Sequence, residues 1–300
     1  MLGQLSMKSD GQLRDKVQAA IDRLRCFEPQ EGYWVAFSGG KDSQCVYHLC
    51  KMAGVKFEAH YAVTSVDPPE LVQFIKDHYP DAWAGRVHQY NSDGKAITMW
   101  NLIPQKKMPP TRIVRYCCEV LKESSGDGRV TVTGVRWAES SKRNANHGIV
   151  TFQNAGKKQT NKVLDLAPSS AHTTSSGRLI LNDDNAESRR AVEFCYRTHK
   201  TLVNPIVDWD DDDVWEFLNT NNIPHCCLYD EGFKRLGCIG CPLGGKQKQE
   251  LQRWPKYREM YIRSFEKMLK ARREAGVETT KWKNAEDVMK YWLQEEDTEG

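Results

Sequence analysis

The stretch "WVAFSGGKDSQCVYHL", residues 34–49, decides the fold. The apolar run 33–37 is typical of a buried strand, and residues 42–52 have the spacing of a helix. Between them, two adjacent glycines permit positive φ angles and let the backbone approach an anion closely. The start of the helix offers unpaired N–H groups and a positive dipole end, and Lys41 adds a point charge. The sequence therefore predicts a phosphate-binding loop between a strand and a helix.

Strands and helices alternate through the first half of the chain. This alternation predicts an α/β fold with a doubly wound, mostly parallel sheet, in which ligands bind beyond the carboxyl ends of the strands. The Ser-Gly-Gly turn lies at that end of the first strand. We predict strands at 33–37, 57–63, 86–90 and 129–135, and helices at 12–26, 42–52 and 68–79.

The chain changes character at about residues 140–190, which are rich in Ser, Thr, Asn, Gly and Lys and show little periodicity. We interpret this segment as an excursion that carries a short strand or two and forms a flap, rather than as a second domain. Order resumes with a helix through Leu218, which Asp210 or Asp211 can cap. We predict one domain over residues 1–245 and a helical C-terminal extension over 246–300, with one long helix and one shorter one.

Composition limits the function classes. The chain has 300 residues, a net charge of only +3 and a pI near 8.2, so any nucleic-acid surface must be a local patch. The first residues lack the apolar core of a signal peptide, and no apolar run is long enough to span a membrane. We therefore expect a cytoplasmic protein without a membrane partner.

The ten cysteines are unevenly spread. In a reducing compartment, cysteines that cluster favour metal binding or redox chemistry over disulfides. We expect the scattered cysteines to be small buried side chains. The clusters are Cys117-Cys118, Cys226-Cys227 and the C-x-x-C of Cys238 and Cys241; the scattered ones are Cys26, Cys45, Cys50 and Cys195.

The loop is not the G-x-x-x-x-G-K-[ST] loop of the common NTPases. It resembles the PP-loop, S-G-G-x-D-S, of the ATP pyrophosphatases, which cradles pyrophosphate while a substrate is adenylated. "TSVDPPE" (64–70), "GVRWAES" (134–140), "PPTRIVRYCCEVLK" and "NPIVDWDDDDVWEFL" resemble the phosphoadenylyl-sulfate (PAPS) reductase branch of that superfamily. The resemblance implies an adenine nucleotide alpha hydrolase-like fold.

The resemblance also implies roles for individual residues. Lys41, Asp42 and Arg136 are expected to be catalytic, although a surface salt bridge is the plain alternative for Arg136. Arg112 and Arg115 suit a site that holds a polyphosphate and a negative cluster, with simple surface exposure as their alternative. The nucleotide-binding residues implied are Ser38, Gly39, Gly40, Lys41, Asp42, Ser43, Asp67, Arg112, Arg115 and Gly134.

In the cluster-bearing members of this branch, a Cys-Cys pair and a distant C-x-x-C hold one [4Fe–4S] cluster. The resemblance assigns Cys117, Cys118, Cys238 and Cys241 as its ligands. A cubane needs four thiolates that converge from different directions, so a vicinal pair on a helix requires local distortion. Structural zinc and free thiols are the alternatives. We interpret Cys226-Cys227 as structural, with a persulfide carrier as the alternative.

Two departures separate the sequence from the assimilatory sulfonucleotide reductases. Those reductases use a catalytic tail cysteine, whereas no cysteine follows Cys241, and their loop commonly lacks the lysine found here at Lys41. The pattern is similar to the sulfurtransferase that builds DNA phosphorothioate linkages and, more distantly, to cluster-bearing tRNA thiolases. It implies ATP and Mg²⁺, transfer of AMP to an acceptor, and displacement of AMP by sulfur from an external donor such as a cysteine desulfurase.

Two other functions stay open at this point. One is a sulfonucleotide (PAPS or APS) reductase that uses an external thiol, and the other is a non-enzymatic nucleotide-binding subunit. The acceptor could be DNA, tRNA or a small molecule. The basic stretches Lys142–Lys162 and 246–273 could follow a nucleic-acid backbone or could simply be solvated. A homodimer and the role of the cluster are also left open.

Overall fold

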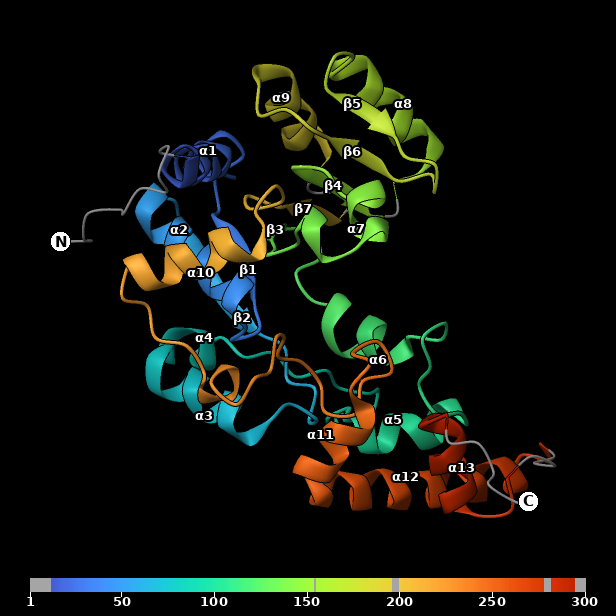
Figure 1. Ribbon diagram of the computed structural model, residues 1–300. Helices are drawn as coiled ribbons and strands as arrows, with labels where there is room; N and C mark the ends of the chain where they lie inside the picture. Colours follow the sequence, from blue (N-terminus) through green and yellow to red (C-terminus); the bar gives the residue numbers. More distant parts are fainter. Residues whose placement is uncertain (1–11, 154, 196–199, 278–281, 295–300) are drawn as a thin grey trace. The chain divides into compact units, whose positions relative to one another are not determined.

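The computed structural model describes residues 12–153, 155–195, 200–277 and 282–294 (Figure 1). The chain forms two compact units, and each is assembled from three separate segments. The chain first passes from the larger unit to the smaller one just after β2 (Phe57–Tyr61). It returns to the larger unit within α3 (Pro69–His78). The larger unit comprises Met1–Tyr61, Gln73–Arg86 and Gly126–Gly232, and the smaller comprises Ala62–Val72, Val87–Ser125 and Phe233–Gly300. The boundary predicted at residue 245 stays a prediction.

Seven strands within the described residues form one sheet in the larger unit, in the order β2-β1-β3-β7-β4-β6-β5. The first four are parallel, which confirms the α/β prediction. β1 lies between β2 and β3, so Val35 faces Ala59 on one side and Val132 on the other. The strands are β1 (Tyr33–Phe37), β2 (Phe57–Tyr61), β3 (Val130–Val132), β4 (Val150–Gln153), β5 (Ala171–Thr173), β6 (Leu179–Leu181) and β7 (Lys200–Val203).

The prediction of a flap over residues 140–190 is wrong. This segment contributes three strands, β4, β6 and β5, which extend the parallel sheet in antiparallel pairing beyond β7. All three residues of β6 are buried, so the strand lacks the alternation of polar and apolar residues that identifies a half-exposed strand. The helices of the segment are α7 (Ser141–Asn146), α8 (Lys157–Leu166) and α9 (Ala186–Cys195), and α8 and α9 pack together beside β5 and β6 (Figure 1).

The strand predicted at 86–90 is also wrong. Val87 and Tyr90 make only isolated bridges, to Ala62 and Ala96. An apolar alternation over so few residues forms a strand only where a neighbouring strand is available to pair with it.

The helices of the larger unit pack around α2, which follows the Ser-Gly-Gly turn. α2 contacts α1, α10 and β1, and it ends at Gly54 in the left-handed conformation that glycine favours. α10 begins as predicted: Asp210 is the cap and accepts a hydrogen bond from the Asp213 amide. The helical segments are α1 (Gln12–Cys26), α2 (Lys41–Ala53), α4 (Pro80–Ala84), η2 (Trp137–Glu139), α10 (Asp211–Thr220) and η3 (Cys227–Tyr229).

The smaller unit is helical. α12 packs against α5, α11 and α13, and its core is aromatic: the rings of Tyr261 and Trp292 have centroids 4.6 Å apart. The single long helix predicted from residue 246 is two helices, because Pro255 cannot donate the N–H that would continue α11 and instead starts α12. The segments are α5 (Met99–Lys106), α6 (Tyr116–Cys118), η1 (Glu119–Glu123), α11 (Gln247–Arg253), α12 (Pro255–Glu274) and α13 (Ala285–Trp292).

Among the residues that the structure describes, no helix has both the length and the apolar character needed to cross a membrane.

Candidate functional site

The loop that begins at Ser38 has the geometry of an anion cradle. It leaves the carboxyl end of β1 through Gly39, whose φ of +75° favours glycine, and enters α2 at its N-cap, Gly40. The N-cap residue has no side chain to accept a hydrogen bond from this helix end, and the amide of the first helical residue, Lys41, donates to a hydroxyl group from another segment. Ser43 donates to the Gly40 carbonyl at 2.8 Å and lies 3.2 Å from the Ser38 hydroxyl. The loop is therefore held in shape by its own hydroxyl groups.

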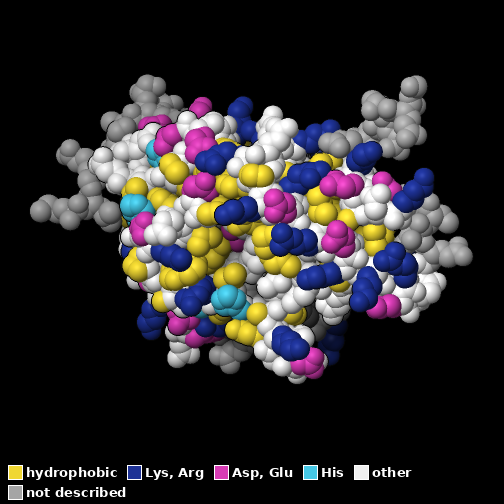
Figure 2. Space-filling model, turned by 90° about the horizontal axis from the view of Figure 1, so that it is seen from below, with side chains coloured by type: hydrophobic (Ala, Val, Ile, Leu, Met, Phe, Trp, Pro, Cys, Tyr) yellow, Lys and Arg dark blue, Asp and Glu magenta, His cyan; other side chains and the backbone are white. Residues whose placement is uncertain are grey.

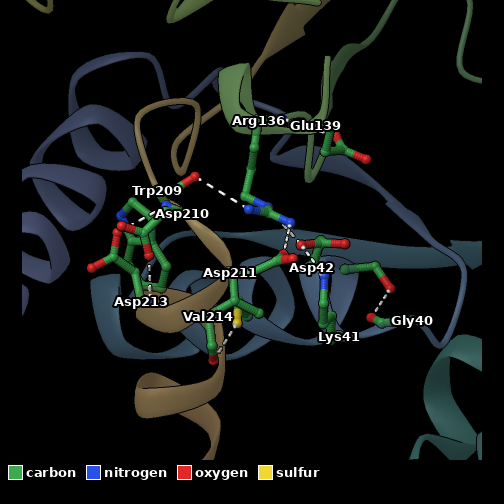
Figure 3. A network of polar contacts seen from close by, with 12 residues as sticks. Gly40, Lys41, Asp42, Arg136, Glu139, Trp209, Asp210, Asp211, Asp213 and Val214 are labelled. Carbon is green, nitrogen blue, oxygen red and sulfur yellow. Dashed lines mark hydrogen bonds and ion pairs between the residues drawn. The ribbon is translucent and has the colours of Figure 1, made fainter. Parts of the chain in front are cut away.

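Two buried cations converge beside this loop (Figure 3). Lys41 Nζ lies 3.0 Å from Asp211 Oδ1, and Arg136 Nη2 lies 2.6 Å from the same oxygen. Arg136 Nε also donates to Asp42 Oδ1 at 2.7 Å. The side chain of Arg136 is only 3% exposed, so the surface salt bridge considered for it is wrong. Burial disfavours its charge, yet Asp42 and Asp211 outweigh that effect and raise the pKa of Arg136.

Gly134 acts through its lack of a side chain. A Cβ at this position would lie 2.9 Å from the backbone of Asp42, closer than real Cβ contacts. The glycine thus lets the chain after β3 approach the first turn of α2, and this approach brings Arg136 within reach of Asp42.

The contacts of two residues beside the loop were not predicted from the sequence. The Lys41 amide donates to the Tyr229 hydroxyl at 2.9 Å, which orients the first turn of α2. Asp211, considered only as a helix cap, instead pairs with Lys41 and Arg136. Tyr229 lies between Cys226-Cys227 and the C-x-x-C of Cys238 and Cys241, and nothing local in its segment identifies a contact 188 residues away.

The four predicted cysteine ligands line one cavity, and all belong to the smaller unit. Cys117 and Cys118 end α6, and the helix continues as one π-helical segment, η1. The predicted distortion beside the vicinal pair is therefore present. Cys238 and Cys241 flank a turn in which the Cys241 amide donates to the Cys238 carbonyl at 3.2 Å. The cavity has an empty volume of about 360 Å³, open solvent included.

The thiols influence one another. A hydrogen bond with Cys118 raises the pKa of Cys117, and the same bond, together with Arg115, lowers the pKa of Cys118. Burial raises the pKa of Cys238 to about 11, although the Lys122 ammonium opposes this rise. The attraction of Cys238 and of Asp67 raises the pKa of Lys122 in return. One cysteine of the pair is thus prepared as a thiolate, and a cation lies against the C-x-x-C turn.

Asp67, Arg112 and Arg115 lie in the same unit as the cysteines, whereas Ser38–Ser43 and Arg136 lie in the other. Asp67 accepts a hydrogen bond from Thr64 at 2.7 Å and lies beside Cys238. Arg112 is exposed and donates to the Pro242 carbonyl at 2.9 Å, and Arg115 is 3.6 Å from Glu123. Their predicted role in nucleotide binding stays a prediction.

All ten cysteines lie in the described part of the chain, and none of them forms a disulfide. Cys45, Cys50 and Cys195 are buried as predicted, whereas Cys26 is only half-buried. Cys226 is buried and Cys227 is exposed, and both belong to the larger unit, whereas the other four clustered thiols belong to the smaller one.

Residues 32–243 match the model of the phosphoadenosine phosphosulfate reductase domain. The chain belongs to this family. The match includes every site residue named above, from Ser38 to Cys241. The helices α11, α12 and α13 lie outside the phosphoadenosine phosphosulfate reductase domain, although Trp292 and Tyr261 line the cysteine cavity.

Curated relatives in the family cover short parts of the chain. An adenosine 5'-phosphosulfate reductase of Oceanobacillus iheyensis is 35% identical over 83 residues, which are 27% of this chain and 33% of the relative. One of Neisseria meningitidis is 40% identical over 53 residues, which are 17% of this chain and 22% of the relative. The alignments span a third or less of the length of these relatives.

Solved structures give a weaker likeness. Candida glabrata FMN adenylyltransferase in complex with FAD and inorganic pyrophosphate is 14% identical, with a TM-score of 0.46, over 79% of this chain and 68% of that one. The phosphate complex of the PAPS reductase from Candida auris is 14% identical, with a TM-score of 0.37, over 79% and 98%. Both TM-scores are below 0.5.

Proposed function

We propose that this protein is an ATP-dependent iron–sulfur sulfurtransferase, which adenylates an acceptor with release of pyrophosphate and then replaces the AMP by sulfur. The observation that carries the proposal is the convergence of two buried cations, Lys41 and Arg136, on a single oxygen beside the uncapped start of α2. A lysine and an arginine fixed beside the positive end of a helix form a site for a polyphosphate.

The chain's own residues suit the adenylation step. An acceptor oxygen attacks the α-phosphorus of ATP, the bond from the α-phosphorus to the bridging oxygen breaks, and pyrophosphate leaves with the electron pair. Lys41, Arg136 and the Ser38–Ser43 loop stabilise the charge that builds on the departing pyrophosphate. Burial of both cations strengthens this effect, because they face little competing water. Mg²⁺ is the expected companion of the triphosphate.

The cysteine cavity fits a [4Fe–4S] cluster. Within the described residues, no group of three or more Cys, His, Asp or Glu side chains is arranged to hold a single metal ion. Each thiolate of a cubane binds a different iron, so its ligands surround a volume rather than a point. Four thiols around one cavity, one with a lowered pKa, match that requirement. When bound, such a cluster would supply a centre that exchanges electrons.

The residues around the cavity would position such a cluster. Cys117, Cys118, Cys238 and Cys241 would hold it, and Lys122 would offset part of its negative charge. Since all four cavity cysteines are used as ligands, the sulfur that displaces AMP has to come from an external donor. A protein such as a cysteine desulfurase suits this role. It offers the outer sulfur of a persulfide, and two equivalents of an external thiol, oxidised to a disulfide, would reduce that sulfur to sulfide, which then displaces AMP.

We propose a nucleic acid as the acceptor on the basis of α12. This helix carries seven Lys or Arg residues and three Glu. Four of its five exposed basic residues recur at positions i, i+7, i+11 and i+14, which lie on one helical face: Lys256, Arg263, Lys267 and Lys270. Two of these four, Arg263 and Lys270, also lie near Glu residues of the same helix. Figure 2 shows Lys and Arg side chains over the face that it views, interspersed with acidic ones. Binding of a polyanion along such a stripe weakens steeply with salt.

A sulfonucleotide reductase is the second candidate. The family itself and the adenosine 5'-phosphosulfate reductases among the relatives favour it. In that reaction, the Lys41 and Arg136 site would bind the phosphate of an already adenylated sulfate, and no pyrophosphate would form.

One experiment separates the two candidates. Protein purified anaerobically is incubated with ATP and Mg²⁺, and separately with PAPS or APS plus thioredoxin, with DNA or tRNA present or absent. Pyrophosphate, AMP and sulfite are measured together. Pyrophosphate and AMP from ATP, lost in Lys41→Ala and retained in Lys51→Ala, would support the sulfurtransferase. Sulfite from the sulfonucleotide, with ATP intact, would establish the reductase.

A further inference from the structure

Asp211 makes contacts that a helix-capping residue does not make. The cap of α10 is Asp210, which exchanges hydrogen bonds with Asp213 at 2.8 Å in both directions. Asp211 is the first residue of the helix, and its side chain is 67% exposed. Only its Oδ1 is engaged in the contacts described, and that one oxygen accepts from both Lys41 and Arg136.

The two cations differ from Asp211 in their surroundings. Lys41 and Arg136 are nearly completely buried, and the network also contains Asp42, which accepts from Arg136 at 2.7 Å. Asp42 is fixed within the first turn of α2, directly after the loop. Asp211 reaches the same cations from another element, with most of its side chain in solvent (Figure 3). Two positive and two negative groups therefore balance, and Asp211 is the exposed member.

We propose that Asp211 occupies the phosphate subsite of Lys41 and Arg136 and competes with the polyphosphate for it, so that it sets the affinity for pyrophosphate and assists its release. This inference rests on the proposed function, because it takes the two cations as the phosphate subsite. A phosphate oxygen that binds both cations has to take the position of Asp211 Oδ1. The carboxylate then has only to turn toward solvent, where its charge is hydrated at little cost.

The competition has a consequence for turnover. Without Asp211, the two buried cations would be balanced in this network by Asp42 alone and would hold a polyanionic product tightly. A carboxylate that returns to them as pyrophosphate leaves lowers the cost of emptying the site. Because Asp211 lies on α10 and not on the loop, its return does not require the loop to change shape.

The test compares three proteins in binding to inorganic pyrophosphate, by calorimetry with and without Mg²⁺: the natural chain, Asp211→Asn and Asp212→Asn. Asp212 lies in the same first turn of α10, is exposed, and has the same charge. It therefore controls for the loss of one charge near a helix N-terminus. We expect Asp211→Asn to bind pyrophosphate on the order of tenfold more tightly, and Asp212→Asn to bind it as the natural chain does.

Each other outcome has a definite meaning. If Asp211→Asn binds pyrophosphate no more tightly than Asp212→Asn, the inference is wrong while the phosphate subsite stands. Weaker binding that appears only with Mg²⁺ would make Asp211 a partner of the cation, which also overturns the competition. If neither the natural chain nor either variant binds pyrophosphate, the proposed function fails, and the inference fails with it. Thermal unfolding of all three proteins confirms that they are folded.

Discussion

Gly134 shows how one missing side chain positions a site. Its Cα lies so close to the first turn of α2 that a Cβ would meet Asp42 backbone atoms at 2.9 to 3.0 Å. Backbone cannot move aside as a flexible side chain can. The close approach is what allows Arg136, two residues later, to reach Asp42 and Asp211.

We expect Gly134→Ala to lower the free energy of unfolding by about 1–3 kcal/mol, as overpacking does, and to weaken nucleotide binding at least tenfold. Chemical denaturation and ATP-binding titrations measure the two effects. Gly237→Ala is the matched control, since nothing lies within 4 Å of the Cβ it would gain. Equal behaviour of the two variants would contradict the role assigned to Gly134.

At the scale of an element, α10 depends on its first turn. The Asp210 carboxylate accepts from the Asp213 amide, and the Asp213 carboxylate accepts from the Asp210 amide. Asp213 is fully buried and also pairs with Lys16, so the cap is tied to α1. The helix start holds Asp211 in place beside Lys41.

Asp210→Ala removes the cap and should lower the free energy of unfolding by about 1 kcal/mol. Asp212→Ala, in the same turn but outside the capping pair, should change the free energy of unfolding by only a few tenths of the change expected for Asp210→Ala. Urea unfolding of both variants provides the comparison. A larger loss in Asp212→Ala than in Asp210→Ala would show that charge, rather than capping, stabilises the helix.

The vicinal cysteines belong to a second element with unusual geometry. α6 passes directly into the π-helical η1, which widens the turn after Cys118. Adjacent side chains on a regular helix point in different directions, and the wider turn changes where the following residues, including Lys122, are placed. The result is a cavity lined by Cys117, Cys118 and Lys122 together.

We expect Cys117→Ala and Cys238→Ala each to lose most of the bound iron and the visible absorption of the purified protein, because three thiolates leave one iron without a ligand. Iron analysis and absorption spectra after anaerobic purification measure this. Cys227→Ala is the control, as an exposed cysteine of the larger unit. Retained iron in both cavity variants would disprove the cluster assignment.

At the scale of the whole molecule, two half-buried histidines make stability depend on pH. Burial lowers the pKa of His48 and of His147 to about 4, with nearby Lys51 acting on the first and Arg178 and Arg143 on the second. The ordinary pKa of a histidine is 6.5. Between pH 4 and pH 6.5, the unfolded chain therefore binds protons at these two histidines that the folded chain does not. Stability is therefore complete above pH 6.5 and is lost as the pH falls toward 4.

The expected decrease in the free energy of unfolding is on the order of 2 kcal/mol for each histidine, a value that already allows for their partial exposure. Thermal unfolding from pH 7.5 to 4.5 measures it. The double variant His48→Gln, His147→Gln should flatten that dependence, whereas His172→Gln, at an exposed position, should keep it. An unchanged slope in the double variant would exclude these two histidines as its source.

The sequence predicted the parts of this molecule that depend on local pattern. β1, the Ser38–Ser43 turn and α2 form one continuous signal, and the fold class followed from the alternation of strands and helices. The partners of Arg136 were not predicted, because they come from segments distant in sequence. The residues around Asp211 in the sequence indicate a helix cap, and only the folded chain brings Asp211 to Lys41.

The antiparallel half of the sheet was predicted only in part, as a short strand or two within a flap, and the reason is different. β4, β5 and β6 have three or four residues each, and β4 and β6 are almost completely buried whereas β5 is largely exposed. Strands this short depend on their neighbours rather than on their own propensity: β4 pairs with β7, β6 with β4, and β5 with β6. Their polar surroundings in the sequence therefore indicated a loop.

The segmented composition of the smaller unit fixes an order of events during synthesis. Its cavity takes Thr64 from the first segment, the Cys117 and Cys118 pair from the second, and Trp292 from the third. A chain emerging from the ribosome exposes the first two thiols long before the residues that enclose them exist. The cavity closes only after Trp292 has been made, so until then its cysteines are more open to oxidation than they are in the folded unit.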